Sequence, residues 1–242
     1  MKDVEVLHMK TYLFTAVEFQ QQLDEICEKK QLQTMLFLSL PILREVMCSE
    51  TYADLVKHIP LLMPGEEDVL IMHDVEQYKA QHLLMTDSYL HILCRYLEES
   101  GHSLYLVGDD IEKLSFFLHY CKEQYKDLRI VGTFVGGEQM DDEALLNDIN
   151  VTCPEVVLTA IQPQVQENWI IKNRDKLNGL VCIGANVLVE QLMQRVIGKQ
   201  EQNNHMYLYN QWIAQKNKWL HERKRRYFKK DYELYMTQKQ GS

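Results

Sequence analysis

Gln166 and Glu167 are the first side chains in this sequence whose position suggests chemistry. They stand one step into an expected helix, directly after the apolar run 156–161 breaks at Gln162 and Pro163. In a parallel α/β sheet such a break lies at the carboxyl end of a strand, where these folds bind their ligands. An amide and a carboxylate there could hydrogen-bond a sugar hydroxyl or a nucleotide base, or could cap the helix.

Acidic residues follow two other apolar runs. Residues 66–68 are Glu-Glu-Asp, of which one carboxylate could act as a general base, or the group could hold a cation. His73 and Asp74 come just after an expected strand at 69–72, and a histidine oriented by a carboxylate can move protons near neutral pH. Solvation of a loop is the alternative for both sets.

Gly108 and Asp109 lie between an expected strand and an expected helix. The stretch lacks the GxGxxG fingerprint and the lysine of a P-loop, which disfavours an NAD enzyme or a P-loop ATPase. Backbone amides at a helix start could still hold a phosphate, while Gly108 could equally serve as a turn residue.

Metal and redox chemistry have no motif in this chain. The six cysteines are scattered without the spacing of a zinc or redox site, and we interpret them as small buried hydrophobic residues. No GxSxG elbow or kinase signature occurs either. We therefore expect neither a metal nor a cofactor.

The elements that must position these residues alternate regularly. We expect strands at 4–9, 34–40, 69–72, 103–107, 128–134, 156–161 and 180–187, with a loop at 60–68. We expect helices at 15–30, 42–59, 86–100, 111–125, 141–150, from 163 to 177, and from 187 to about 196. The pattern predicts a Rossmann-like α/β domain with a mainly parallel sheet and helices on both faces.

The chain divides at a polar linker, 198–204, into an expected domain at 1–197 and a basic, aromatic, helical appendage at 198–242. Residues 211–242 carry nine basic and three acidic side chains, a net charge of +6, which leaves −15 for the remaining residues. No run is long and apolar enough to span a bilayer and no signal peptide is evident, so we expect a cytoplasmic protein.

The appendage contains WLHERKRRYFKK, which would suit a membrane surface, a nucleic acid or simply solvent. Nucleic acid is disfavoured because the acidic body would repel phosphate.

Five segments in this order resemble the WecG/TagA/CpsF glycosyltransferases (glycosyltransferase family 26). They are SLYLVGDDIEKL, RIVGTFVGG, INVTCPEV, VQENWI and LVCIGANV, within a similarity that covers roughly residues 4–196. The resemblance implies transfer of a hexose or N-acetylhexosamine from a UDP-sugar to a polyprenyl-diphosphate-linked acceptor. It also implies bacterial cell-surface polysaccharide synthesis at the inner face of the cell membrane, without a metal.

The resemblance also implies roles for particular residues. Donor contacts fall on Gln166, Glu167, Gly108, Asp109, Gly184 and Asn186. Contacts with an anionic membrane fall on Arg223, Lys224, Arg225, Arg226, Lys229 and Lys230. Gly65 stands where the family has its proposed catalytic aspartate, so the base is expected to be the adjacent Glu66, or Asp74.

Several family positions have changed in this chain. Leu38 and Leu40 replace a threonine and an asparagine, His82 replaces an arginine, and Gln162 replaces the glycine before the Gln-Glu pair. The alternative hypothesis is therefore a catalytically inactive homologue that binds or regulates an active glycosyltransferase. Association with a second copy is the other partner hypothesis.

Overall fold

The computed structural model describes residues 2–71, 86–136, 140–201, 228 and 231–232. The strands are β1 (Lys2–Val6), β2 (Met9–Leu13), β3 (Gln33–Leu38), β4 (Leu61–Pro64), β5 (Ser103–Gly108), β6 (Arg129–Val135), β7 (Val156–Ala160) and β8 (Val181–Gly184). The helices are α1 (Ala16–Lys29), α2 (Leu40–Cys48), α3 (Glu50–Lys57), α4 (Glu67–Ile71), α5 (Thr86–Ser100), α6 (Ile111–Gln124), α7 (Asp142–Thr152), α8 (Val165–Asn173), the 3-10 turn η2 (Arg174–Lys176) and α9 (Asn186–Glu201).

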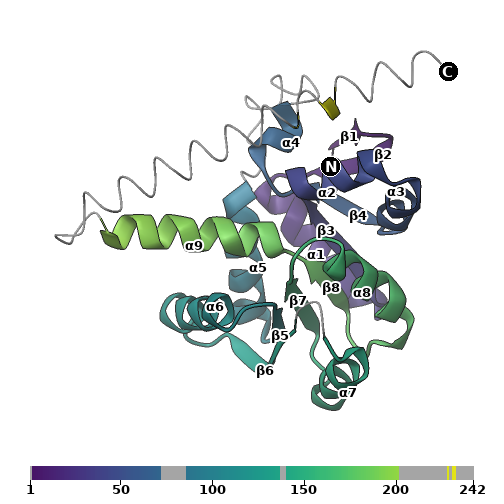
Figure 1. The fold of residues 1–242 in the computed structure, drawn as a ribbon. Helices are drawn as coiled ribbons and strands as arrows, with labels where there is room; N and C mark the ends of the chain where they lie inside the picture. Colours follow the sequence, from purple (N-terminus) through teal and green to yellow (C-terminus); the bar gives the residue numbers. More distant parts are fainter. Residues whose placement is uncertain (1, 72–85, 137–139, 202–227, 229–230, 233–242) are drawn as a thin grey trace.

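The eight strands form one sheet in the order β1-β2-β4-β3-β8-β7-β5-β6 (Figure 1). Every neighbouring pair is parallel except the hairpin of β1 and β2. The predicted Rossmann-like α/β fold is confirmed. The chain passes from β7 to β8 in one direction along the sheet and from β5 to β6 in the other, so the switch point lies between the neighbouring strands β7 and β5. The crevice at such a point is where open α/β sheets bind ligands.

Side-chain alternation along the strands assigns the helices to two faces. In β5, Leu104 and Leu106 pack into an apolar cluster with α1, α5, α6 and α9. Tyr105 and Val107 pack into a second cluster with α7 and α8, and the third cluster joins α2 and α3 to β3 and β4. Because successive side chains point to opposite faces, α1, α5, α6 and α9 cover one face and α2, α3, α7 and α8 the other.

Capping residues set several helix starts where the sequence predicts them. Thr15 accepts a hydrogen bond from the Glu18 amide while the Glu18 carboxylate accepts one from the Thr15 amide, a complete capping box for α1. Asp110 and Asp141 accept bonds from the first-turn amides of α6 and α7. No helix of the described part of the chain is long and apolar enough to cross a membrane.

Three predicted strands are wrong in detail. The run at 180–187 is a strand only at Val181–Gly184, because α9 already begins at Asn186. The run at 4–9 is part of a hairpin whose turn is formed by Leu7 and His8, both with positive φ, without the Asn-Gly signal that usually marks such a turn. Residues 69–71 are helical, and the strand lies at 61–64, inside the expected loop. Pairing with β3 and β2 on both sides stabilises this short strand, and its proline stands at the last position.

The interpretation of the cysteines is correct for half of them. Cys94, Cys121 and Cys182 are buried, Cys27 is half-buried, and Cys48 and Cys153 are exposed. Cys48 and Cys153 lie at helix ends, where the chain turns toward solvent. Burial raises the pKa of the Cys182 thiol to about 12, as expected for an inert core thiol.

Candidate functional site

The parallel strands end together at one edge of the sheet, here called the carboxyl edge. Register pairs bring Leu38 beside Pro64, Gly108 beside Ala160, and Thr159 beside Gly184. Two polar networks meet at this edge on the turn that joins β7 to α8, residues 161–164. We name them the Glu167 network (Tyr52, Thr159, Gln164, Gln166, Glu167) and the Lys113 network (Asp109, Lys113, Gln162, Asn186, Glu190).

Four members of the Glu167 network are buried, and Gln164, at the start of α8, is exposed. Glu167 has an exposed fraction of 0% and Gln166 of 1%. One carboxylate oxygen, Oε2, accepts hydrogen bonds from the Tyr52 hydroxyl at 2.8 Å and from the Gln164 amide at 2.5 Å. The other, Oε1, accepts one from Gln166 Nε2 at 3.0 Å. Three donors therefore converge on one buried carboxyl group.

Burial dominates the titration of this carboxyl group. It raises the pKa of Glu167, and the hydrogen bonds from Tyr52, Gln166 and Gln164 oppose that rise only in part. Burial, with the neighbouring Glu167 carboxylate, also raises the pKa of Tyr52, so this phenol stays protonated and acts as a donor. A donor set of this kind favours the ionised carboxylate, and its position in the first turn of α8 does the same.

Gly184 and Thr159 leave the space that Gln166 occupies. A Cβ atom on Gly184 would lie 2.9 Å from Gln166 Nε2 and 2.6 Å from Leu36 Cδ1. The Thr159 hydroxyl lies 3.2 Å from Gln166 Oε1 and 3.1 Å from the Ile183 carbonyl oxygen, and it can donate to either. The glycine at 184 is thus required by close approach of Gln166 rather than by backbone conformation.

The Lys113 network lies on the opposite face, beside α6 and α9. Lys113 Nζ donates to Asp109 Oδ1 and to Asn186 Oδ1, both at 2.8 Å, and to Glu190 Oε1 at 3.3 Å. Asp109 Oδ2 accepts the Gln162 amide at 2.7 Å. The Lys113 and Asp109 side chains are 13% and 16% exposed, so solvent reaches this network.

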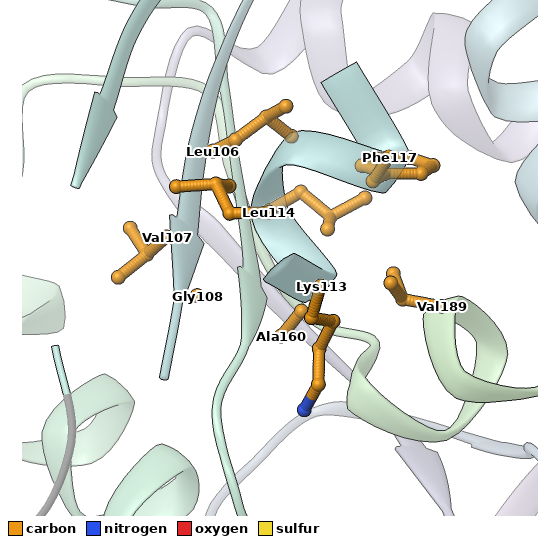
Figure 2. A pocket seen from close by; sticks show the side chains of 9 residues that line it. Leu106, Val107, Gly108, Lys113, Leu114, Phe117, Ala160 and Val189 are labelled. Atoms are coloured by element: carbon orange, nitrogen blue, oxygen red, sulfur yellow. The ribbon is translucent and has the colours of Figure 1, made fainter. Parts of the chain in front are cut away.

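The carboxyl edge holds little empty space beside Lys113. Figure 2 shows the Lys113 side chain extending from the start of α6 past the end of β7, with Val189 of α9 opposite. The hollow that Lys113 lines, together with Gly108 and Ala160, has a volume of about 10 Å³. This is about the room one water molecule needs, so this hollow by itself is too small for a sugar nucleotide.

Glu66 lies at the same edge, where β3 and β4 end. It is half-buried, and its Oε1 accepts a hydrogen bond from the Leu40 amide at 3.0 Å. The preceding Gly65 donates its amide to the Leu38 carbonyl at 2.8 Å. A Cβ atom on Gly65 would lie 2.4 Å from Val187 Cγ1, so this glycine permits close packing of β4 against α9.

The predicted site residues fall into three groups. Glu66 and Asp109 reach the carboxyl edge and are partly exposed, whereas Gly108, Gly184, Asn186, Gln166 and Glu167 lie there but are buried. Asp74 and His73 lie outside the described residues, as do the six basic residues 223–226, 229 and 230.

Tyr52 and Lys113 were missed by the sequence reasoning. Lys113 stands four residues after Asp109, a spacing that often pairs charges and could have drawn attention to it. Tyr52 is 115 residues from Glu167, and no local pattern indicates that contact.

Part of the C-terminal segment packs against the body of the protein. Phe228 is 4% exposed and lies in the apolar cluster formed by α2 and α3, with Tyr232 packed at its border. Arg44 of α2 lies 3.6 Å from Asp231. These contacts join the appendage to the side of the sheet that carries β3 and β4.

Comparison with protein families yields one match. A family described as Glycosyl transferase WecG/TagA/CpsF matches residues 4–209 of the 242. No curated protein sequence matches the chain.

Proposed function

The chain belongs to the WecG/TagA/CpsF glycosyl transferase family, and from this premise we propose a specific reaction for it. The family indicates a glycosyltransferase of cell-surface polysaccharide synthesis, with a sugar donor and an acceptor. The proposed donor is a UDP-linked hexose or N-acetylhexosamine. The proposed acceptor is a polyprenyl-diphosphate-linked sugar at the inner face of a bacterial membrane.

The arrangement of the carboxyl edge is the observation that carries this proposal. The ends of β4, β5 and β8 bring Glu66, Asp109 and Asn186 to one edge, and the 161–164 turn lies among them. Carboxylate, amide and ammonium groups bind sugar hydroxyls well, and helix starts attract a diphosphate through their dipoles, although Asp110 already accepts the first amides of α6. Both features suit a sugar nucleotide better than a purely apolar ligand.

Glu66 is the proposed general base. It would take the proton from the acceptor hydroxyl as that oxygen attacks the anomeric carbon and the bond to UDP breaks. The negative charge that develops on the leaving diphosphate would be stabilised by helix amides and by the basic residues of 223–230. Asp74 is the alternative base, and Gln166 and Glu167 would support the donor side.

The basic appendage, residues 198–242, is the proposed membrane contact of a domain formed by 1–197. Each basic residue near an anionic surface contributes roughly 1 kcal/mol, so six in one segment would hold the protein on a leaflet. The packing of Phe228 and Tyr232 against α2 and α3 supports a position of this segment close to the Glu66 side of the edge.

A second candidate is a catalytically inactive partner of an active glycosyltransferase. The observation in its favour is that the polar atoms of Gln166 and Glu167 are occupied inside the protein. One oxygen of Glu66 is likewise bonded to the Leu40 amide. In this version the chain keeps the fold and binds a second glycosyltransferase or a second copy of itself.

Turnover on vesicles tests the proposal. The full chain would be assayed with UDP-N-acetylhexosamine and a polyprenyl-diphosphate-linked sugar in anionic vesicles, and UDP binding would be measured by calorimetry. Glu66→Gln should lower turnover by about 10²–10⁴-fold, as expected for loss of a general base, and should leave UDP binding nearly unchanged. Turnover should also fall in neutral vesicles or at high salt.

Glu28→Gln is the matched control. Glu28 is an exposed carboxylate on α1, and it is distant in sequence from the residues of the carboxyl edge. It should change neither turnover nor binding. Unaltered turnover in Glu66→Gln would exclude Glu66 as the base. Absence of UDP binding at millimolar concentration in the wild-type protein would contradict the enzyme and favour the inactive partner.

A further inference from the structure

The 161–164 turn has an unusual backbone. Gln164 has φ 71° and ψ −49°, close to the strained form of the γ-turn, a conformation that residues with side chains rarely adopt. Such a conformation persists only where surrounding bonds hold it. Here the bonds come from two carboxylates, since Asp109 accepts the Gln162 amide and Glu167 accepts the Gln164 amide.

Each carboxylate is itself held by one donor from another helix. Lys113 of α6 donates to Asp109, and Tyr52 of α3 donates to Glu167. The Tyr52 bond joins α3, which lies in the connection from β3 to β4, to α8, which lies in the connection from β7 to β8. At the other end of the same helix pair, Arg174 Nη1 donates to the His58 carbonyl at 3.0 Å.

The Tyr52 hydroxyl has no substitute in its position. Glu167 Oε2 accepts from Tyr52 and from the Gln164 amide, and because Glu167 is fully buried and Tyr52 is 8% exposed, water has little access to the place of a lost Tyr52 hydroxyl. Without the hydroxyl, the carboxyl group would take up a proton or rotate toward a new partner. Either change would weaken the Gln164 bond that holds the turn.

We infer that Tyr52 is a positioning residue for the sugar-nucleotide site, acting through Glu167 on the 161–164 turn. Tyr52 touches no ligand in this role. It fixes the shape of the turn whose backbone forms part of the carboxyl edge. The ligand part of the inference rests on the proposed function, whereas the effect on the turn does not.

Tyr52→Phe tests the inference because it removes only the hydroxyl oxygen. Hydrogen exchange of the amides of residues 161, 162 and 164–166 should accelerate about tenfold, and UDP binding should weaken about tenfold, which corresponds to ~1.4 kcal/mol. Tyr89→Phe is the matched control, since Tyr89 is also buried and its hydroxyl accepts the Phe14 amide on another part of the sheet. It should leave both measurements unchanged.

The double variant Tyr52→Phe/Glu167→Gln provides a rescue. A neutral amide needs fewer donors than a buried carboxylate and can still accept the Gln164 amide, so exchange protection should return toward the wild-type level. If only the aromatic ring of Tyr52 mattered, the second substitution would restore no exchange protection, because phenylalanine keeps that ring in both the single and the double variant.

Three outcomes would overturn the inference in distinguishable ways. Unchanged exchange in Tyr52→Phe would show that the hydroxyl does not hold the turn. Faster exchange with unchanged UDP binding would show that the turn does not shape the ligand site. If the wild-type protein binds no UDP, the proposed function fails, and with it the ligand part, while exchange still decides whether Tyr52 holds the turn.

Discussion

Two chains of hydrogen bonds, here called relays, have the same arrangement and reach the 161–164 turn from opposite faces of the sheet. In each, a donor on a helix holds a carboxylate, and the carboxylate holds a turn amide. One relay runs from Lys113 through Asp109 to Gln162, and the other runs from Tyr52 through Glu167 to Gln164. They differ in environment, because the Lys113 and Asp109 side chains are partly exposed whereas Tyr52 and Glu167 are buried.

The environment explains the choice of donor. A lysine can hold Asp109 because its ammonium keeps some contact with water and has two further oxygen partners. Burying a full ion pair beside Glu167 would cost much of the solvation of both charges. A neutral phenol and two amides supply hydrogen bonds there without a second buried charge. A charged donor therefore holds the partly exposed carboxylate of Asp109, and neutral donors hold the buried carboxylate of Glu167.

The comparison predicts that removing the Glu167 carboxylate destabilises the protein more than removing the Asp109 carboxylate. This difference in the free energy of unfolding is the largest expected effect. Glu167→Ala should lower the free energy of unfolding by about 3–5 kcal/mol, because it leaves buried donors unpaired and opens a cavity. Asp109→Ala should cost about 1 kcal/mol, because water can replace a partly exposed carboxylate. Urea denaturation of both variants measures the difference. Equal costs would refute the contrast between the relays.

Alanine substitutions at Gly184 and Gly108 test the same comparison, with the next largest expected effects on stability. Gly184→Ala should destabilise the protein by about 1–2 kcal/mol, since the new Cβ meets Leu36 and Gln166 below 3.0 Å in a filled interior. Gly108→Ala, beside the Lys113 network, should change stability by less than about 0.5 kcal/mol. Its nearest contact would be 3.3 Å, to Leu114 Cβ. Thermal or urea unfolding would decide, and a larger loss for Gly108→Ala would contradict this account.

The smallest expected effect is a difference in pH dependence. Burial raises the pKa of Glu167 above its ordinary value of 4.5. Between that value and the raised pKa the folded protein binds more protons than the unfolded chain, so stability should fall as the pH rises through the interval. Glu167→Gln should remove this slope when the free energy of unfolding is measured across pH 4.5–8.

Glu155 should have the opposite effect on the pH dependence of stability, because its pKa is lowered rather than raised. Burial would raise its pKa, but hydrogen bonds from Ser103 lower it below 4.5 overall. Its contribution to stability should be present above 4.5 and lost as the pH falls through its folded pKa. Glu155→Gln should therefore alter the acid side of the profile only. A slope above pH 4.5 that persists in Glu167→Gln would show that another group titrates there.

Much of the fold could be predicted from local patterns. The capping box at Thr15, the stripe of 86–100 with Gly101 after it, and the apolar runs at 103–107 and 156–161 each indicate an element that the structure contains. Two of the strand predictions failed for different reasons, one because the stabilising contacts are distant in sequence and the other because a local turn has no recognisable signal. The strand at 61–64 forms only by pairing on both sides, and the hairpin turn at Leu7 and His8 lacks a turn signal.

The sequence by itself determined the alternation of strands and helices, the family, and which polar residues stand at strand ends, because these depend on residues close together in the chain. Only the tertiary structure decided that Gln166 and Glu167 are buried, and that Tyr52 and Lys113 hold the two sides of one turn. The physical reason is that burial and hydrogen-bond partners depend on which helices pack across the sheet. Contacts between residues as far apart as Tyr52 and Glu167 leave no periodic trace in the sequence.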